Sequence, residues 1–345
     1  MIRFAVGEFG QRRWAEATAH FRDSSLLQSW EYGDARARDG RWRVERGLLT
    51  EGEQVIGAAQ VMVRRLPVIG GGLAWLSRGP LWRRSGAEPA KVLCDALEVL
   101  RRHYAEDRGF YFRVAPPVLD NDPACTIFAA AGFGSTDALG WASAVLDLAP
   151  PETDLRAGLR QKWRNSLNKA ERQGVSIECG TDDRGIVSCL DDYRALLAAR
   201  DFATGVTPEL LADLHSLLPE DRKLVQYRAR HEGRIVGFAV MARYGEQCEY
   251  LVGNIDDAGR RAGAGQLLLW RAVCDMKARG CALFDLGGMD PERTAPGIFR
   301  FKDGLGGTPY RLAPEIEAPS SGLLNRLVRW RVTRARGGDA GVRAA

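Results

Sequence analysis

The chain has 345 residues, of which 45% are hydrophobic, and its formal net charge is +5. This length exceeds one average domain and the apolar content can fill two modest cores, so we expect two domains. Met1 to Gly10 form no apolar leader, and no uncharged apolar run approaches the roughly 18 residues of a membrane span, so we expect a cytoplasmic protein without a signal peptide.

The sequence lacks the motifs of several enzyme classes. The seven cysteines are scattered without a Cys-x-x-Cys pair, and the four histidines show no metal-like or triad-like spacing. No G-x-S-x-G elbow and no Walker loop occur, which excludes the usual hydrolase and NTPase motifs. We therefore expect no metal and no tightly held cofactor.

The first half of the chain predicts the order strand, strand, helix, strand. The β-branched run that begins at Val55 predicts the first strand, and the turn Arg78-Gly79-Pro80 follows the second. Apolar residues at helical spacing predict the long helix, which Gly109 ends. The strands fall over 55–67, 73–76 and 110–114, the long helix over 88–107, and a short helix closing at 129–133 precedes a strand over 142–148.

Paired prolines, Pro150-Pro151, predict the domain boundary, because they continue neither a helix nor a strand. The second half then predicts one helix over 153–173, with six basic residues against one acid between Arg156 and Arg172. Its apolar residues fall on one stripe, which predicts a buried face. That stripe consists of Leu155, Leu159, Trp163, Leu167 and Ala170, and helices over 184–200 and 208–217 follow.

The order strand, strand, helix, strand returns at 234–241, 249–253, 266–278 and 283–285. The run VIGAA at Val55 matches IVGFA at Ile235, which indicates an internal duplication. The repeated unit resembles the GNAT acyltransferase fold, in which adjacent strands splay apart. We therefore expect an α/β fold of the α+β type, with two tandem GNAT-like domains over 1–150 and 151–320 and mixed, splayed sheets. A basic C-terminal helix and tail are expected over 321–345.

Five segments in sequence order carry a more specific resemblance. They are Leu27–Trp30 with Gly40–Trp42 downstream, Ser77–Pro80, Lys162–Glu171, Phe284–Gly288 and Phe299–Gly307. This set is similar to the FemXAB family, which moves amino acids from aminoacyl-tRNA onto amines of peptidoglycan precursors. The long coiled-coil arm of some members is missing, so the similarity is closest to the compact type.

The FemXAB resemblance also implies partners. Aminoacyl-tRNA would be the cosubstrate, and the acceptor would be a UDP-linked or lipid-linked muropeptide precursor or another amine, including one on a natural-product intermediate. It further implies peripheral association with the inner face of the membrane, and we expect a monomer.

Lys302 is the predicted catalytic residue. It follows two aromatic residues and precedes the glycine-rich turn Gly304-Leu305-Gly306-Gly307. The resemblance implies that this lysine lies beside the reacting groups, with Phe301 as a wall of the substrate channel. Attack of an amine on an ester needs a stabilised oxyanion, and a fixed ammonium can supply that stabilisation. The alternative is a surface lysine on a loop.

Two arginines are predicted to bind substrate phosphates. The resemblance implies that Arg200, and Arg36 from the first domain, meet the diphosphate of a nucleotide-linked precursor. A guanidinium suits a diphosphate because it donates two parallel hydrogen bonds. Each arginine could equally be neutralised by a neighbouring acid, Asp201 or Asp34.

Tyr250 and Asp285 end the strands that are predicted to border the opening of the second sheet. A tyrosine there can orient an amine or a carbonyl, and an aspartate can hold an ammonium nucleophile. Asp285 can equally cap the turn Leu286-Gly287-Gly288.

The basic helix is predicted to bind tRNA through Arg160, Lys162 and Arg164, since phosphates attract clustered cations. A solvated helix face without a partner is the alternative.

One motif favours a different donor. Arg260-Arg261-Ala262-Gly263-Ala264-Gly265 precedes a predicted helix and fits the R-x-x-G-x-G loop by which GNAT enzymes bind the CoA pyrophosphate. An acyl-CoA-dependent N-acyltransferase is therefore the second hypothesis. A third is a duplicated module without activity that binds a cell-wall precursor or RNA.

Overall fold

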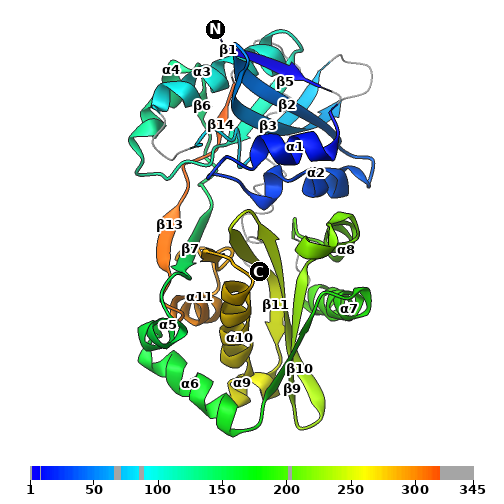
Figure 1. Cartoon of the computed structure of the whole chain (residues 1–345), viewed down its shortest axis with the longest axis vertical. Helices are drawn as coiled ribbons and strands as arrows, with labels where there is room; N and C mark the ends of the chain where they lie inside the picture. The colour runs from blue at the N-terminus through cyan, green and yellow to red at the C-terminus, as the bar shows by residue number, and fades with distance from the viewer. Residues whose placement is uncertain (1, 8, 66–70, 85–88, 201–203, 319–345) are drawn as a thin grey trace. The chain divides into compact units, whose positions relative to one another are not determined.

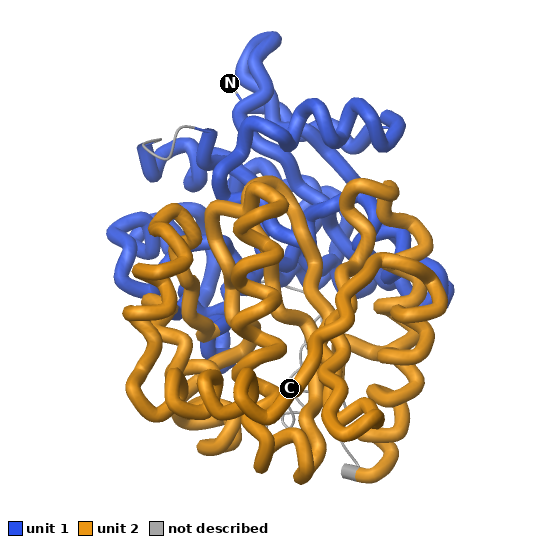
Figure 2. Tube along the Cα trace, turned by 60° about the horizontal axis from the view of Figure 1, so that its bottom comes forward, with its two compact units in different colours: residues 1–141, 311–340 blue, residues 142–310, 341–345 orange. Residues whose placement is uncertain are grey.

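A computed structural model describes residues 2–7, 9–65, 71–84, 89–200 and 204–318 (Figure 1). The chain divides into two compact units, of which unit 2 runs from Ala142 to Tyr310 (Figure 2). Unit 1 consists of Met1–Trp141 and a segment that begins at Arg311. Each unit is built on a mixed seven-stranded sheet. The tail predicted over 321–345 lies outside the described residues.

Unit 1 combines its sheet with short helices. Ser29 begins the second of these, because its side chain accepts a hydrogen bond from Tyr32 N. The strands are β1 (Ile2–Val6), β2 (Arg43–Glu51), β3 (Gln54–Arg65), β4 (Gly72–Ser77), β5 (Phe110–Ala115), β6 (Gly134–Ser135) and β14 (Ile316–Glu317). The helices are α1 (Gln11–Thr18), α2 (Trp30–Ala37), α3 (Ala90–Arg101) and α4 (Ile127–Ala130).

Unit 2 has longer helices on both sides of its sheet, with α7 and α8 on one side and α6 and α10 on the other (Figure 1). Its strands are β7 (Ala142–Asp147), β8 (Ser176–Gly180), β9 (Val225–His231), β10 (Arg234–Tyr244), β11 (Gln247–Ile255), β12 (Leu283–Asp285) and β13 (Thr308–Arg311). Its helices are α5 (Glu152–Gly158), α6 (Gln161–Arg172), α7 (Asp183–Arg200), α8 (Pro208–Leu217), α9 (Asp257–Ala262), α10 (Ala264–Ala278) and α11 (Pro296–Asp303).

The two sheets have the same strand arrangement. The first runs β1-β2-β3-β4-β5-β14-β6, and the second, read from its far edge, runs β8-β9-β10-β11-β12-β7-β13. In each, the first five strands follow sequence order and the fourth and fifth are parallel. The predicted repeats fall on β3 and β10, on β4 and β11, on α3 and α10, and on β5 and β12. The expected mixed α/β fold with a duplicated unit is confirmed.

The sixth strand of each sheet is exchanged between the two halves of the chain. β14, which follows unit 2 in sequence, pairs with β5 and β6 in the first sheet. β7, which follows β6 in sequence, pairs with β12 in the second sheet. Arg113 on β5 forms a buried ion pair with Glu315, just before β14, with 2.5 Å between Nη2 and Oε2. The late segment is therefore part of the core of unit 1.

Because of this exchange, the structure differs from the prediction in the assignment of one strand and in the place where the two units divide. The strand predicted over 142–148 was assigned to the first copy, but β7 hydrogen-bonds into the second sheet. The division between the units accordingly falls between Trp141 and Ala142, whereas the sequence predicts it at Pro150-Pro151.

The single helix predicted over 153–173 is two helices, α5 and α6. Leu159 and Arg160 between them have extended backbones, with ψ of 138° and 141°. This break frees Arg160 N to donate to Gly304 O at 3.0 Å. The predicted apolar stripe is nevertheless buried, including Trp163 and Leu167.

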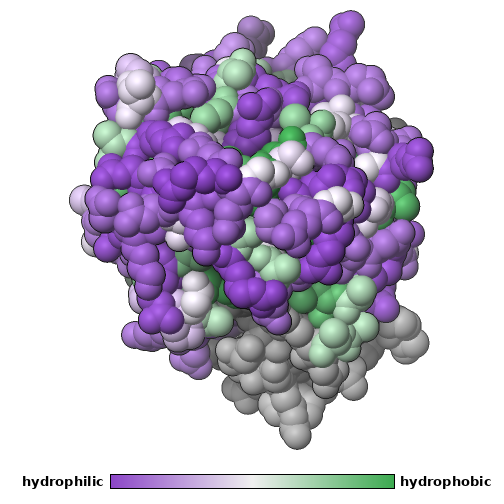
Figure 3. Space-filling view, turned by 90° about the horizontal axis from the view of Figure 1, so that it is seen from below, coloured by the Kyte–Doolittle hydropathy of each residue, from purple (hydrophilic) through white to green (hydrophobic). Residues whose placement is uncertain are grey.

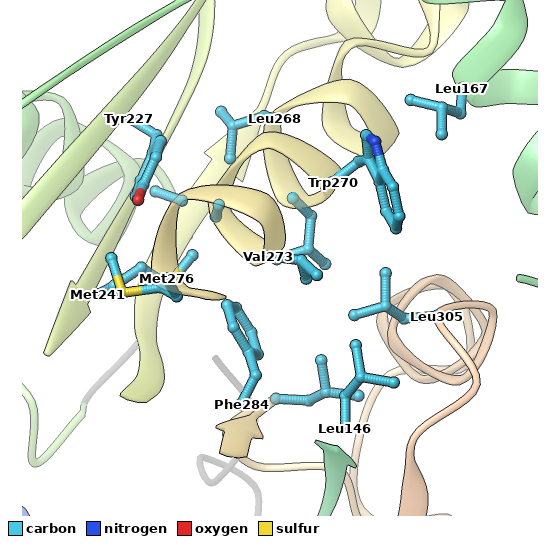
Figure 4. Close-up of a cluster of buried hydrophobic side chains, with 14 of the residues drawn as sticks. Leu146, Leu167, Tyr227, Met241, Leu268, Trp270, Val273, Met276, Phe284 and Leu305 are labelled. Carbon is cyan, nitrogen blue, oxygen red and sulfur yellow. The ribbon is translucent and has the colours of Figure 1, made fainter. Parts of the chain in front are cut away.

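Helix α10 forms the centre of the core of unit 2 (Figure 4). Its side chains Leu268 and Trp270 pack among residues of the sheet, of α6 and of the segment after α11. Phe284 on β12, which is fully buried, packs in the same cluster. The core therefore fixes β12 against α10.

The Leu27–Trp30 segment has a structural role in unit 1. The Gln28 side chain donates to Ser77 O at 2.7 Å and accepts from Gln60 N at 2.8 Å. Arg46 lies over the Trp30 ring at 3.6 Å and pairs with Asp34 at 2.7 Å. Buried polar groups that are all engaged in this way hold α2 on the sheet.

Candidate functional site

Strands β11 and β12 pair over a short distance and then diverge. Their parallel register covers only three positions and ends at Glu249 opposite Asp285. On its other side, β11 has a bulge at Leu251, because Val240 and Met241 pair with Val252 and Tyr250. Tyr250 is thus the first residue beyond the pairing with β12.

The corresponding strands of unit 1 stay together. β4 and β5 are paired at all six positions, from Gly72 opposite Phe110 to Ser77 opposite Ala115. The expected splay therefore occurs between β11 and β12 of unit 2 and not between β4 and β5.

A cavity of about 570 Å³ lies at the divergence of β11 from β12. Helix α7, the end of β11, the start of α10 and helix α11 all contribute to its wall. Tyr250, Phe301 and Lys302, which the sequence singled out, lie together in this wall. The other lining residues are Tyr193, Leu196, Leu197, Gly253, Asn254, Ile255, Arg260, Gly265, Gln266, Ala295, Gly297 and Ile298.

The Lys302 side chain is buried, with 2% of its surface exposed. Its Nζ donates to Gly288 O at 3.0 Å and lies 5.1 Å from the centre of the Tyr250 ring, which is within the range of a cation–π contact. Burial lowers the pKa of Lys302 to about 8, while the charges of Asp285 and Glu249 act in the opposite direction. Lys302 is therefore a buried amine at the cavity, and the expected alternative of a surface lysine does not apply.

Phe301 is fixed by α6 and by the start of α10. Trp163 on α6 donates from Nε1 to Phe301 O at 3.0 Å. A Cβ on Gly265 would lie 3.3 Å from Phe301 Cε2, so the ring packs against the first turn of α10. Gly304 admits the Trp163 ring, since a Cβ there would lie 2.3 Å from Trp163 Cδ1. The two motif segments around Trp163 and Phe301 thus pack on each other.

Tyr250 lies across Gly253 on the same strand, because a Cβ on Gly253 would meet Tyr250 Oη at 2.4 Å. Burial raises the pKa of the Tyr250 phenol, which keeps it protonated and able to donate.

Asp285 faces the protein interior. Its carboxylate accepts from Ser143 Oγ at 2.5 Å, from Tyr310 Oη at 2.5 Å and from Gly287 N at 2.8 Å. The bond from Gly287 N is the turn-capping contact that was the alternative to substrate binding.

Comparisons with known proteins agree with this architecture. Residues 157–303 match the family described as acetyltransferase (GNAT) domain. The crystal structure of FemX superposes with a TM-score of 0.80 at 14% sequence identity, over 94% of this chain and 99% of the FemX chain. The protein has a FemX-like tandem GNAT fold.

Two further structures share this fold. A conserved protein of unknown function from Bacteroides thetaiotaomicron VPI-5482 has a TM-score of 0.61 and 14% identity, over 93% of this chain and 100% of that one. A tandem GNAT protein from the clavulanic acid biosynthesis pathway has a TM-score of 0.50 and 14% identity, with the same coverage. The curated proteins gave no match to the sequence.

Of the two predicted phosphate-binding arginines, Arg36 is not among the residues of the cavity wall. Arg200 ends α7, and its side chain lies outside what the structure describes. Arg36 is a half-buried residue of α2 in unit 1. Asp34, its proposed neutralising partner, forms an ion pair with Arg46.

The predicted tRNA-binding residues lie on and next to α6, and the face of unit 2 that carries this helix is largely hydrophilic (Figure 3). Lys162 is exposed. Arg160 pairs with Asp303 at 2.8 Å, and Arg164 donates to Ala157 O at 3.1 Å. Two of the three cations are thus held in place by the protein itself.

The R-x-x-G-x-G segment is folded into α9 and the start of α10. The Arg260 guanidinium donates to Ile255 O and pairs with Asp257. Gly263 is left-handed, with a φ of 77°, and a Cβ there would lie 2.4 Å from Ser166 O on α6. Gly265 and Gln266 nevertheless line the cavity.

Sequence reasoning missed several residues of the site. Tyr193 and Asn254 line the cavity, and Ser143 and Tyr310 bind Asp285. The position of Asn254 near the end of a predicted strand was a usable signal.

None of the described helices has the length and apolar character that a membrane crossing requires.

Proposed function

We propose that the protein transfers an amino acid from aminoacyl-tRNA to an amine of a peptidoglycan precursor or of a related peptide-like acceptor. The tandem GNAT-type fold supports the general reaction, transfer of an acyl group to an amine. The likeness to FemX supports the aminoacyl donor and the cell-wall acceptor.

The observation that carries the proposal is the buried ammonium of Lys302 in the wall of the cavity. The acceptor nitrogen attacks the ester carbonyl carbon, a C–N bond forms, and the bond from that carbon to the ribose oxygen breaks. The amine loses a proton and the ribose oxygen gains one. Negative charge develops on the carbonyl oxygen, and a positive charge that is already in place in a low-dielectric site stabilises it.

The aminoacyl ester is itself activated, so the reaction requires no metal and no tightly held cofactor. Helix α6 supports tRNA as the carrier, because Lys162 is exposed beside Arg160 and Arg164. The acceptor would be a UDP-linked or lipid-linked muropeptide or another amine. A lipid-linked acceptor would bring the protein to the inner face of the membrane. We propose a monomeric, cytoplasmic enzyme.

An acyl-CoA donor is the second candidate, because Arg260, Gly265 and Gln266 line the cavity at the start of α10. Three observations rank it lower. The Arg260 guanidinium already has partners in Asp257 and a backbone carbonyl, and Gly263 N donates to Arg260 O at 3.2 Å. In addition, Ser166 on α6 leaves no space beside Gly263.

The test mixes purified protein with alanyl-, seryl- or glycyl-tRNA, or with acetyl-CoA, and with muropeptide amines as acceptors. Mass spectrometry detects the amide. We expect product with a charged tRNA and none with acetyl-CoA.

Product from acetyl-CoA alone would replace the first proposal by the second. If neither donor gives product but the protein binds muropeptide or RNA, the chain is a binding module.

A further inference from the structure

The carboxylate of Asp285 has partners on both of its oxygens. Oδ1 accepts from Ser143 Oγ at 2.5 Å and from Gly287 N at 2.8 Å, and Oδ2 accepts from Tyr310 Oη at 2.5 Å. Asp285 is 7% exposed and Ser143 is 1% exposed. Hydrogen bonds to a buried charge are strong, so this group fixes the local backbone.

That backbone is the turn that holds Lys302. Lys302 Nζ donates to Gly288 O at 3.0 Å. Gly287 has a φ of 67°, and a Cβ there would lie 2.3 Å from Tyr250 O, so the turn passes close to β11. Ser143 Oγ also lies 2.9 Å from Gly287 O, and it can therefore donate to either acceptor. Gly288, whose carbonyl oxygen accepts the hydrogen bond from the Lys302 ammonium, follows directly after Gly287 in the sequence.

Ser143 and Tyr310 come from distant parts of the chain. Ser143 lies on β7 and Tyr310 on β13, near the two places where the chain passes from one unit to the other, at 141/142 and 310/311. Neither residue is part of the cavity wall. Any effect that they have on the reaction must therefore act through Asp285 or, for Ser143, also through its direct contact with Gly287 O.

We infer that Ser143 and Tyr310 are positioning residues for the transfer step, because through Asp285 they fix the turn at Gly287 and Gly288 that sets the place of the Lys302 ammonium. The kinetic part of this inference rests on the proposed function. A merely structural role is the alternative, since the same hydrogen bonds also stabilise the fold.

The chain offers a matched control for Tyr310. Tyr227 on β9 donates to Asp275 on α10 at 2.5 Å, the same length and chemistry, but on elements other than the turn at Gly287. Tyr310→Phe and Tyr227→Phe each remove one hydroxyl donor from an aspartate. Their effects on thermal stability should be similar, and their effects on the site should differ.

The first experiment compares these two variants in the transfer assay. A small displacement of a catalytic group can cost up to about a hundredfold in rate. We expect Tyr310→Phe to lower kcat by about tenfold or more with KM nearly unchanged, and Tyr227→Phe to retain the wild-type kcat. Ser143→Ala should act as Tyr310→Phe does.

The second experiment needs no activity. The chain has six lysines, so ε-¹³C-lysine labelling gives a simple NMR spectrum, in which Lys302→Met identifies the Lys302 signal. We expect the Lys302 signal to shift in Tyr310→Phe and Ser143→Ala and to stay unchanged in Tyr227→Phe. The titratable or charged groups around Lys302 are Asp285 on β12, Glu249 and Tyr250 on β11, and Tyr193 and Arg260 in the same cavity wall.

Asp285→Asn tests the charge separately. Because the Asp285 charge raises the pKa of Lys302, its removal should move the Lys302 titration to lower pH. A Lys302 signal that matches wild type in both Tyr310→Phe and Ser143→Ala would overturn the inference. If the wild-type protein transfers no acyl group, the proposed function fails and the NMR result alone decides whether these residues position Lys302.

Discussion

Lys302 is an ammonium that the fold keeps away from water. A charge in such surroundings acts strongly on nearby groups because little solvent screens it. The same burial lowers the pKa of Lys302 to about 8, so the charge itself depends on pH. The Gly288 carbonyl and the Tyr250 ring compensate part of the lost hydration.

Lys302→Met should suppress transfer and leave the fold intact. Methionine keeps much of the apolar stem and removes the charge. The loss of one preorganised stabilising group costs about a hundredfold or more in turnover, on the order of 3 kcal/mol. Single-turnover rates with charged tRNA and acceptor measure this.

Lys91→Met is the control for that change, because the Lys91 side chain is 77% exposed in unit 1. Its loss should leave turnover unchanged. A Lys302→Met protein that matches the Lys91→Met protein in rate would remove Lys302 from the mechanism.

The pH dependence of transfer should report the state of Lys302. Its ammonium is present below a pKa of about 8 and is lost as the pH rises through that value. The contribution of the charge to kcat should therefore fall between about pH 7 and 9. In Lys302→Arg the guanidinium stays charged, so the ratio of wild-type to Lys302→Arg rates should decline over this window. A constant ratio would argue against a titrating ammonium.

Some residues at and near the site could be predicted from the sequence, and others could not. Lys302 and Phe301 stand in a distinctive motif, and the structure places both at the cavity. Ser143 and Tyr310 are serine and tyrosine residues without a motif, 142 and 25 positions away from Asp285. Only the folded backbone brings them to that carboxylate.

At the level of elements, the spacing of apolar residues predicted β3, β10, α10 and β12 well. Buried strands and buried helices each leave a clear apolar pattern in the sequence. The prediction failed at the break between α5 and α6. The apolar stripe continues through Leu159 at helical spacing, so the pattern alone favours one helix. Tertiary hydrogen bonds of Arg160 with Asp303 and Gly304 favour the break.

Gly304→Ala should destabilise unit 2. Its Cβ would lie 2.3 Å from Trp163 Cδ1, so Trp163 or the end of α11 must move. Overpacking of this kind costs about 1–3 kcal/mol. Thermal unfolding should show a lower midpoint for Gly304→Ala, whereas Gly297→Ala, with open space around its Cβ, should not show this loss. An equal midpoint for both variants would contradict the packing of Trp163 on Gly304.

Helix α6 should bind tRNA through its cations. Replacement of Arg160, Lys162 and Arg164 by Gln should weaken binding and reduce the slope of log affinity against log salt by nearly one for each lost phosphate contact. Filter binding at several salt concentrations measures both quantities. Arg12→Gln, on a side chain that is 93% exposed in unit 1, is the control. Unchanged binding of the triple variant would make α6 a solvated face.

At the scale of the whole molecule, the duplication was readable from sequence and the strand exchange was not. The repeats share residues at matching positions. Gly57 in VIGAA corresponds to Gly237 in IVGFA, and the two glycines lie on the corresponding strands β3 and β10. β7 and β14 show no sequence preference for either sheet, because backbone hydrogen bonds decide the pairing and every strand can offer them. Because the sequence does not show which sheet β7 joins, it assigns β7 to the first copy and predicts the boundary after it, at Pro150-Pro151.

A fragment of residues 1–150 should therefore not fold stably. It lacks β14 and Glu315, and it leaves Arg113 buried without its carboxylate partner. Loss of one partner of a buried pair costs about 3–5 kcal/mol, a large share of the roughly 5–15 kcal/mol that stabilises a domain. Circular dichroism on heating should show no cooperative transition. A cooperative transition like that of the full chain would show that unit 1 needs no late segment.

The exchanged strand also sets an order of events during synthesis. Residues 142–310 form unit 2 without interruption, and its last strand, β13, ends at Arg311, so this unit has all its strands as soon as Arg311 has left the ribosome. The sheet of unit 1 is still incomplete at that point. Its strand β14, at Ile316–Glu317, is translated after the first 141 residues and after the whole of unit 2. Until then β5 lacks one neighbour and offers an open edge to other nascent chains. In this protein the half that is made first is the half that is finished last.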